Sequence, residues 1–450
     1  MTTNKKTTKS ANDYTIKKKT SANTFDINSV ELNLDDELIY GRPSRLRSLK
    51  YQYEDFNANM YKFFRAHPLI GYSFKRIVYG FLTLLAAIII LFLLVNAVTD
   101  VDQYMPENWD KLGFTHGSDR YNKFLEDRMK LFGVYGTVTE RLLSYLKNIT
   151  PFIPKTIVTG ETIFFVPNES GIGTETISVT TTALLSNVLK VSGEGAWESI
   201  TETKTVWVYL GVVSSKSIGT PGSTEILELF NKAIPYSFAF GSVSVIISYL
   251  IGVPLGIQAA KRKGKPSDNI INSANILLVA APAVVIIIGV YLLSISVFGH
   301  SAMFNSGSFW TKFWPVVALV LLMTPSTVIL TRRYVIDEMT ADYTKFAYAK
   351  GMGETKVYYV HIFRNAGIRI LRQFPLDLAV TLFGASILTE QQWGIPGMSP
   401  FIVKAVSGTK DSFVILGFIS FAAFVRIFAS LVSDLTMVWM DPRVSLGNKK

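Results

Sequence analysis

A stretch of 23 residues without a charged side chain, Ile77–Thr99, limits what this chain can fold into more than any other feature. About 20 consecutive apolar residues are enough for an α-helix to cross the hydrocarbon core of a bilayer. Inside lipid, only helices and closed barrels satisfy every backbone hydrogen bond. The sequence therefore predicts a first membrane-spanning helix at 77–99.

Further apolar windows follow this first span. Three of them are charge-free and two contain ionisable residues, and together they predict five more spans: 236–260, 270–297, 313–331, 374–390 and 412–440. An ionisable residue inside a span is costly in lipid and usually faces protein or water. Asp377, Arg426 and Asp434 are therefore predicted either to have structural roles within the bundle or to take part in transport.

The basic residues outside the spans predict the orientation of the chain. Segments 261–268 and 332–372 carry 4 and 8 Lys or Arg residues against 1 and 4 acidic residues. Cytoplasmic loops of membrane proteins are enriched in Lys and Arg. We therefore expect both loops and both termini in the cytoplasm, which places residues 100–232 outside the cell.

The two long segments outside the spans differ in composition. Residues 1–53 are rich in Lys, Thr, Ser and Asn, which is typical of a disordered cytoplasmic tail, and the basic cluster Lys17–Lys19 either contacts anionic membrane lipid or is only solvated. Residues 54–76 mix aromatic and basic side chains and predict an interfacial helix. Residues 100–232 pass from helical spacing to a half rich in Thr, Val and Ile, which predicts an extracellular α+β insert domain.

The composition excludes several chemistries. The chain has no cysteine and only four histidines, and no two histidines have the i, i+4 spacing of a helical metal site. No nucleic-acid-binding module is visible beside the net charge of +11. The sequence also lacks a P-loop and a series of carboxylates suited to proton coupling. We expect no catalytic residue, metal or cofactor, and either a passive pore, a receptor or a subunit that takes energy from another protein.

The polar segment 332–372 lies between two spans and contains the stretch DYTKFAYAKGMGETKVYYVHIFRNA. This pattern predicts a short helix, a turn at Gly351 and a second helix with Tyr358, Ile362 and Ala366 on one face. Small residues at a turn allow a partner protein to approach the backbone closely. A pair of amphipathic helices on the membrane surface is an equally good interpretation of the residues alone.

The same stretch resembles the cytoplasmic-loop signature of ABC-importer permeases, in the version found in oligopeptide and dipeptide permeases. That version reads roughly D-Y-x-x-x-A-x-A-K-G-x5-V-x-x-x-H-x-x-R-N-A. The matching residues are Asp342, Tyr343, Ala347, Ala349, Lys350, Gly351, Val357, His361, Arg364, Asn365 and Ala366. The segments IGVPLGIQAAKRKGKPSD and LTEQQWGIPGMSPFIVKAVSGTKDSFVILG also resemble this family, as does the terminal Asp-Pro-Arg. The basic FKR before the first span and the large insert are most similar to B-type subunits of Gram-positive bacteria.

The resemblance implies an all-α polytopic membrane protein with six transmembrane helices in the type I ABC importer fold, its permease core at 233–450, and the α+β insert. It implies import of di- or oligopeptides across the cell membrane, without enzymatic activity in this chain. The partners implied are a second homologous permease, two ATP-binding subunits and an extracellular peptide-binding lipoprotein. The segment 332–372 would be the loop that couples the permease to the ATPase.

The resemblance also assigns residues, and it leaves alternatives. In the coupling loop, Lys350, His361 and Arg364 either contact the ATPase or hold the loop on its own bundle. An external gate, or only a connecting turn, is formed by Gln391, Gln392, Trp393, Pro396 and Gly397. Four residues depart from those usual in the family: Tyr348, Gln391, Gln392 and Trp393. These departures bear on which substrate is transported and not on the assignment to ABC permeases. The alternatives are a permease for nickel or a sugar, and a membrane-anchored receptor that acts through residues 100–232.

Overall fold

The computed structural model describes residues 68–440, with short gaps at 107–108, 110–112, 169–172, 193–196, 215 and 217, and the isolated residues 53, 58 and 60. The predicted tail at 1–53 and most of the predicted interfacial helix at 54–76 lie outside the described residues, apart from those isolated positions. The chain divides between residues 71 and 72 into two units, and nearly all described elements belong to the second. From Pro68 onward, the predicted interfacial segment and the first span form one helix, α4 (Pro68–Val98). The helix begins at a proline, which the first turn of a helix tolerates.

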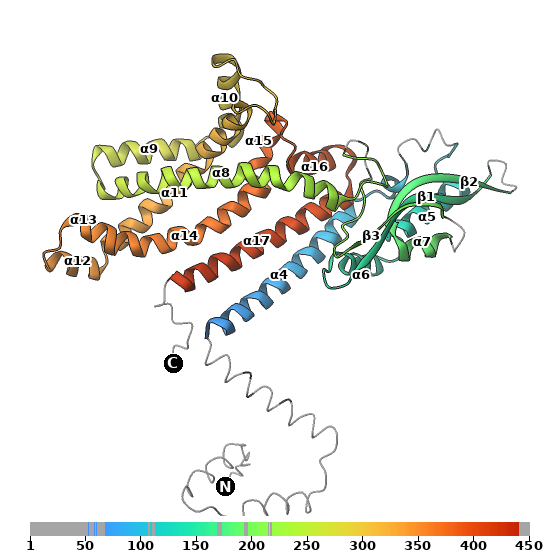
Figure 1. Ribbon diagram of the computed structural model, residues 1–450, viewed down its shortest axis with the longest axis horizontal. Helices are drawn as coiled ribbons and strands as arrows, with labels where there is room; N and C mark the ends of the chain where they lie inside the picture. The colour runs from blue at the N-terminus through green and yellow to red at the C-terminus, as the bar shows by residue number, and fades with distance from the viewer. Residues whose placement is uncertain are drawn as a thin grey trace, which may run out of the picture. The chain divides into compact units, whose positions relative to one another are not determined.

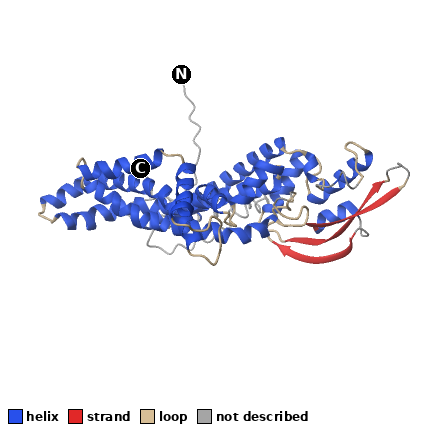
Figure 2. Ribbon diagram, turned by 90° about the horizontal axis from the view of Figure 1, so that it is seen from above, coloured by secondary structure: helices blue, strands red, loops and turns tan. Residues whose placement is uncertain are grey.

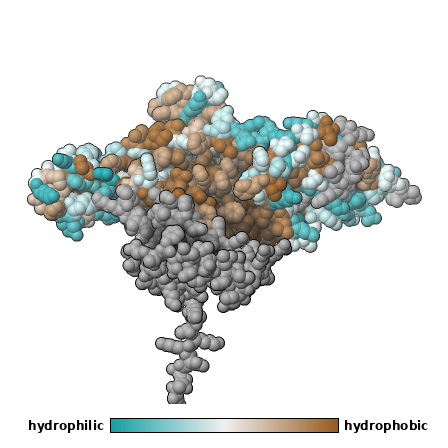
Figure 3. All heavy atoms as spheres, turned by 60° about the horizontal axis from the view of Figure 1, so that its bottom comes forward, coloured by the Kyte–Doolittle hydropathy of each residue, from teal (hydrophilic) through white to brown (hydrophobic). Residues whose placement is uncertain are grey.

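The described residues contain five helices that are long and apolar enough to cross a membrane, or six spans if one bent helix pair counts as a span. Figure 1 shows them in one bundle. They are α4, α8 (Ile226–Lys261), α11 (Trp310–Met339), the continuous run Glu354–Trp393 and α17 (Ser412–Met440). Hydrophobic side chains cover the bundle face between two more hydrophilic ends in Figure 3. The prediction of a helical multi-pass membrane protein with a small insert is thus confirmed.

The third predicted span, 270–297, is not one straight helix. It consists of α9 (Pro266–Ala280) and α10 (Ala283–Leu292), which continues as the π-helical segment η4 (Leu293–Val297), and the two parts meet at an angle of 98°. Pro282 stands at the break. Proline has no backbone N–H and forces the preceding residue out of the helical region, so the helix ends there. The apolar composition predicted a span here but not this bend.

The segment 332–372, which is predicted to be cytoplasmic, is largely helical. Helix α11 continues to Met339 and the next helical run begins at Glu354, which leaves only 340–353 between them, including α12 (Asp342–Ala349). Polar and basic residues do not end a helix once it leaves the hydrocarbon, so hydropathy marks the membrane boundary and not the helix boundary. The run consists of α13 (Glu354–Lys356), η5 (Val357–Ile362), α14 (Phe363–Val380), η6 (Thr381–Ala385) and α15 (Ser386–Trp393).

The insert is an antiparallel sheet with three helices, as the sequence predicts, and its strands are the red elements of Figure 2. The sheet order is β2-β1-β3, so the longest strand is central. Alternating buried and exposed positions along β1 place one face of the sheet on a core. The strands are β1 (Lys155–Pro167), β2 (Thr174–Leu184) and β3 (Trp197–Val206). The short 3-10 helix η1 (Val101–Tyr104) leads into the insert, and its helices are α5 (Asp119–Phe132), α6 (Val138–Ile149) and α7 (Leu185–Ser192).

The insert has a small buried cluster of its own, Ile157, Leu184, Val206 and Tyr209, but its main hydrophobic core is shared with the membrane helices. One cluster of buried side chains contains Phe132 from the insert together with Phe230 and Phe413 from the membrane helices. The rings of Phe132 and Phe413 lie 6.4 Å apart, and those of Phe230 and Phe418 lie 6.5 Å apart. Two short elements, α16 (Ser399–Lys404) and η7 (Ala405–Thr409), precede α17 at this end of the bundle. The insert is therefore packed onto the ends of α8 and α17 and is not a domain on a tether.

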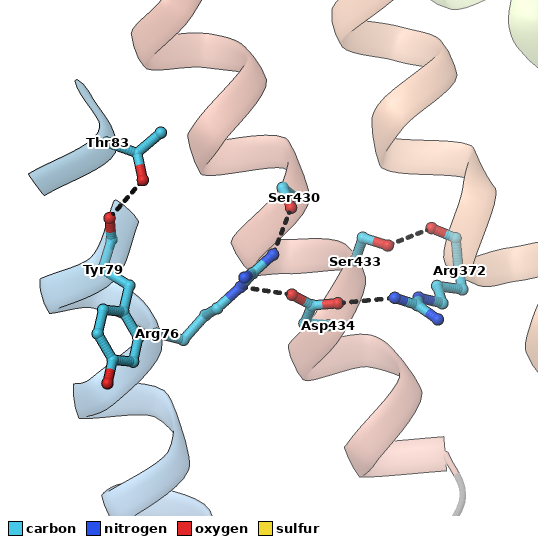
Figure 4. Close-up of polar contacts among 7 residues, drawn as sticks. All are labelled: Arg76, Tyr79, Thr83, Arg372, Ser430, Ser433 and Asp434. Carbon is cyan, nitrogen blue, oxygen red and sulfur yellow. Dashed lines mark hydrogen bonds and ion pairs between the residues drawn. The ribbon is translucent and has the colours of Figure 1, made fainter. Parts of the chain in front are cut away.

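At the opposite end, one buried carboxylate joins three helices (Figure 4). Asp434 of α17 lies 2.6 Å from Arg76 Nε of α4 and 3.0 Å from Arg372 Nη2 of α14. Arg76 also donates to Ser430, and Ser433 donates to the carbonyl oxygen of Arg372, so four contacts join the helices here. Asp434 is thus paired within the bundle, as the structural alternative for this residue predicts.

Arg426 lies on the same helix as Asp434 but in a different environment. It is exposed in the middle of α17, and among the described residues it has no ion-pair partner.

Helices α8 and α11 approach each other through glycines. A Cβ atom on Gly252 would lie 2.9 Å from Thr327 Cβ, and one on Gly256 would lie 2.7 Å from Thr331 Cβ and 2.8 Å from the carbonyl oxygen of Val328. Glycines spaced four residues apart allow membrane helices to pack backbone to backbone. The α8–α11 contact therefore depends on the absence of side chains at these two positions.

We predict that Gly256→Val destabilises the bundle, because the new side chain overlaps backbone and Cβ atoms of α11. Overpacking of this kind costs about 1–3 kcal/mol, which thermal unfolding in detergent measures. The matched control is Gly289→Val in α10, where no described atom lies within 4 Å of the place a Cβ atom would take. Equal unfolding temperatures for the two variants would contradict the assignment.

Candidate coupling loop and gate

The short helix α12 is fixed to the bundle by Glu338, the buried penultimate residue of α11. The Tyr343 hydroxyl donates to the Glu338 carboxylate, and Thr344 Oγ1 donates to the Glu338 carbonyl oxygen at 2.7 Å. Arg369 of α14 approaches the same carboxylate at 3.1 Å. Burial and the hydrogen bond to this carboxylate raise the pKa of Tyr343. Glu338 thus connects α11, α12 and α14 at one point.

The inner face of the loop is apolar and continuous with the bundle. Ala347 packs in one buried cluster with Tyr358, Ile362 and Ala366, which confirms the predicted common face of the second helix. The cluster also includes Ala260 at the end of α8, and Lys261 Nζ lies 4.7 Å from the centre of the Tyr358 ring. The loop is therefore packed on three membrane helices rather than lying free on a surface.

The turn after α12 depends on Gly351. Its φ is +77°, a left-handed conformation that glycine adopts without strain. Within the described part of the chain, no atom lies within 4 Å of the place a Cβ would take. Backbone conformation therefore requires glycine here, and the space beside it is open.

The outer face of the loop exposes aromatic residues among lysines. We call this surface the loop face and define it by Lys345, Phe346, Tyr348, Lys350 and Tyr359. Phe346 is 61% exposed, Tyr348 44% and Tyr359 63%. Lys350 Nζ lies 4.5 Å from the centre of the Phe346 ring. Exposed aromatic residues beside lysines occur both at membrane interfaces and at protein-binding surfaces, so the loop face suits either kind of partner.

The remaining loop residues predicted from the sequence fall into exposed and half-buried positions. Asp342 is fully exposed and pairs with Lys345 at 2.9 Å, which lowers the pKa of Asp342. Ala349 and Arg364 are exposed, whereas His361 is half-buried. Asn365 is also half-buried and lies near enough to Tyr343 to offset part of the rise in the pKa of that tyrosine. Tyr343 and Asn365 thus come together from the two helices, and Arg364 is left on the outside.

Two anchors of the loop region were not singled out from the sequence. One is Glu338 with Arg369, and the other is Asp268, whose carboxylate accepts from Arg332 Nε at 2.7 Å and Arg332 Nη2 at 2.8 Å. Asp268 lies in the first turn of α9 and Arg332 lies 64 residues later in α11. The position of each acidic residue near a helix end is visible in the sequence. The arginine that pairs with it is distant in the sequence, and no local pattern identifies it.

At the other end of the bundle, the predicted gate segment is organised by Glu390, which the sequence prediction did not include. Glu390 is 1% exposed and accepts from the Ser399 backbone N–H at 3.0 Å and from the Ser399 hydroxyl at 2.6 Å. Ser237 of α8 accepts from the Met398 N–H at 2.9 Å. The turn between α15 and α16 is thus closed by two side chains beneath it.

The predicted gate residues occupy two different environments. Trp393 is fully buried, with its ring 5.2 Å from that of Tyr291, whereas Gln391 and Pro396 are exposed and Gln392 is half-buried. A Cβ atom on Gly397 would clash with the carboxylate of Glu390, at 2.3 Å from Oε2. Gly397 is therefore required by the close approach of the carboxylate.

Comparison with known proteins matches both ends of the bundle to one family. The model for "Binding-protein-dependent transport system inner membrane component" matches residues 252–446, which include the loop face and the gate segment. The chain is 30% identical over 229 residues to "Oligopeptide transport system permease protein AmiC" of Streptococcus pneumoniae, covering 50% of this chain and 46% of that protein. This chain thus spans about half the length of that relative.

Two further curated relatives have similar names. "Peptidoglycan transport system permease protein YejB" of Agrobacterium fabrum is 28% identical over 246 residues, covering 50% of this chain and 67% of that protein. "Dipeptide transport system permease protein DppB" of Bacillus subtilis is 27% identical over 231 residues, covering 50% of this chain and 73% of that protein. Among solved structures, the inward-facing MetNI methionine ABC transporter has a TM-score of 0.40 at 12% identity, covering 48% of this chain and 98% of that chain.

We predict that Glu338→Ala releases α12 from the bundle. The Arg369 side chain is 48% exposed, so solvent screens the ion pair, and most of the loss comes from the part-buried hydrogen bond that Tyr343 donates to the carboxylate, about 1–3 kcal/mol. Trypsin should cleave the native variant at Lys345 or Lys350 faster than the wild type. The control is Asp337→Ala, whose carboxylate is 52% exposed and 3.9 Å from Arg369. Identical cleavage of the two variants would rule out Glu338 as the anchor.

Proposed function

We propose that this chain, whose residues 252–446 match the family of binding-protein-dependent transport system inner membrane components, is a permease subunit of an ATP-driven importer of di- or oligopeptides. The observation that carries the proposal is the loop face beside Gly351, an exposed aromatic and basic surface fixed to three helices. The names of two relatives, an oligopeptide and a dipeptide permease, support peptides as the cargo.

The loop face would be the docking site of a cytoplasmic ATPase. An importer needs a source of energy, and the chain contains no P-loop. Because Glu338 fixes α12 to α11 and α14, a displacement of the docked loop would move both helices together. Docking would bias two states of the bundle through the contacts that differ between them. ATP hydrolysis would then belong to the partner subunits and not to this chain.

The predicted loop residues would divide into two roles. Lys350 and Arg364 are exposed, which suits direct contact with the ATPase. Tyr343 bonds to Glu338, Asn365 is half-buried beside it, and Ala347 lies in the buried cluster of the loop, which suits holding the shape of the loop. His361 is half-buried and would belong to the boundary between these roles.

The proposed complex contains four kinds of chain. A second, homologous permease would complete the translocation path, two ATP-binding subunits would dock on the cytoplasmic side, and a peptide-binding lipoprotein would deliver the cargo from outside. Both termini of this chain would be cytoplasmic and residues 100–232 extracellular. The exposed Arg426 in the middle of α17 would face the second permease or the path, because an exposed charge facing lipid is costly.

The segment from Gln391 to Gly397 would form the external gate. Glu390 Oε1 and Trp393 Nε1 are buried and have no hydrogen-bond partner among the described residues. An unpaired buried polar atom costs about 1–3 kcal/mol, so an arrangement that pairs these atoms would compete with the present one. This supports a segment with two states over a fixed turn.

The ATPase activity of the purified complex distinguishes peptide import from the alternative functions. Purified complex should hydrolyse ATP faster when the binding protein carries peptide. If only nickel or a sugar increased the rate of ATP hydrolysis, that compound would be the cargo. If this chain co-purified with no ATPase, a receptor that acts through residues 100–232 would be favoured.

We predict that Gly351→Arg abolishes peptide uptake without preventing membrane insertion. The arginine side chain fills the open space beside the turn and adds a charge to the surface where the ATPase would dock. Co-purification of ATP-binding subunits and uptake of labelled peptide should fall together, while the amount of this chain in the membrane stays unchanged.

The control for this variant is Gly264→Arg in the turn between α8 and α9. Gly264 also has φ +77° and no described atom within 4 Å of a Cβ position, so both substitutions carry the same backbone strain of about 1 kcal/mol. Uptake should survive in the Gly264 variant. Loss of uptake in both, or in neither, would refute the docking site at Gly351.

We predict that labelling of single introduced cysteines confirms the orientation. The chain has no native cysteine, so only the introduced residue can react with the label. Glu202→Cys, exposed in β3, should react with a membrane-impermeant maleimide in intact cells. Lys345→Cys in α12 should react only after permeabilisation. The reverse pattern would invert the topology.

A further inference from the structure

The insert exposes a group of apolar side chains near its attachment to the bundle. Phe152 is 80% exposed, Ile153 45% and Trp207 59%, and Leu143 of α6 is 66% exposed. We call these four residues the insert rim. A soluble domain rarely leaves large apolar residues grouped in this way without a partner.

A buried lysine holds part of the rim in place. Lys155 Nζ donates to the carbonyl oxygens of Thr150 at 2.6 Å, Ile153 at 2.9 Å and Trp207 at 2.8 Å. The turn that carries Phe152 and Ile153 is thereby fixed beside the residue that follows β3. Burial lowers the pKa of Lys155. Three carbonyl groups around one ammonium group make this exposed apolar surface a fixed feature of the insert.

Helix α6, which carries Leu143 and leads into this turn, lies beside the membrane helices and not above them. The rings of Tyr145 and Phe92 are 5.6 Å apart, and the Tyr145 hydroxyl lies 3.1 Å from Ser420 Oγ. Phe92 precedes the end of α4 by about 9 Å, and Ser420 follows the start of α17 by about 12 Å, at 1.5 Å per residue. One face of α6 is thus at the depth of the outer turns of both spans.

The insert end of α4 also exposes large apolar side chains, as a lipid-facing helix does. Towards the insert, α4 exposes Leu94 (62%) and Val98 (68%), within the most apolar span of the chain. Lys147 on the exposed side of α6 adds a positive charge, which suits phosphate groups of lipid. Tryptophan and phenylalanine are typical of the membrane interface.

We propose that the insert rim penetrates the lipid leaflet on the insert's side of the membrane and fixes the insert to the bilayer surface. The partner is the phospholipid itself: acyl chains contact Leu143, Phe152, Ile153 and Trp207, and phosphate groups lie near Lys147. The insert is then held twice, by the core that it shares with α8 and α17 and by lipid, so the sheet has a fixed height above the membrane. The proposal requires only that α4 spans the bilayer.

Spin labels on single cysteines test the proposal in the full-length chain, reconstituted in vesicles of phosphatidylcholine and phosphatidylglycerol. A label at Phe152→Cys should collide often with oxygen, which concentrates in lipid, and rarely with a water-soluble nickel chelate. The matched control is Phe165→Cys, a 50% exposed phenylalanine in β1 near the far end of the β1–β2 hairpin. Its ratio of oxygen to nickel collisions should be severalfold lower.

Leu143→Cys provides a second, independent position and should behave like Phe152→Cys. A label at both rim positions that collides with nickel as often as the Phe165→Cys label would overturn the proposal. Labels shielded from both reagents would also overturn it, because they would show that a protein covers the rim. Unchanged unfolding temperatures of the cysteine variants confirm that the labels report the native fold.

Discussion

Buried carboxylates that each hold a basic residue of another helix are the interactions on which this structure most depends. Asp268 holds Arg332, Glu338 holds Arg369, and Asp434 holds Arg76 and Arg372. Each carboxylate is buried, so losing its partner carries a cost, which solvent moderates because Arg76, Arg369 and Arg372 are about half exposed. These pairs join the helices at the polar end of the bundle, which would let the proposed docking site transmit a displacement to several helices together.

The sequence allowed prediction of features that depend on neighbouring residues. Apolar runs predicted the spans, and helical periodicity predicted that Tyr358, Ile362 and Ala366 share a buried face. The bend at Pro282 is a local feature that the apolar composition concealed. The ion pairs could not be predicted, because Asp434 meets Arg76 across most of the chain. Glu390 was missed for a different reason: its partner Ser399 is near in sequence but follows a turn whose shape the sequence does not reveal.

The insert shows a different limit of sequence reasoning. Alternating residues correctly predicted strands, but a domain boundary was inferred from the change in composition between residues 100–232 and the spans. In the structure, Phe132 of the insert and Phe413 of α17 share one core. Both sides of such a boundary have ordinary composition, and only the contact between them reveals that they fold together. The insert therefore extends the bundle.

The proposed coupling loop and the proposed gate lie at opposite ends of one helical run, Glu354–Trp393. Its 40 residues reach about 60 Å, so a uniform helix would carry a movement of one end directly to the other. This run is interrupted twice, by the π-helical segments η5 beside the loop and η6 before the gate. Such segments are rare and often mark functional sites in helices. They are the places where the run can change its direction or twist while its packed middle, α14, stays intact. A movement of the loop would then reach the gate as a rearrangement at η6, close to the turn that Glu390 holds closed.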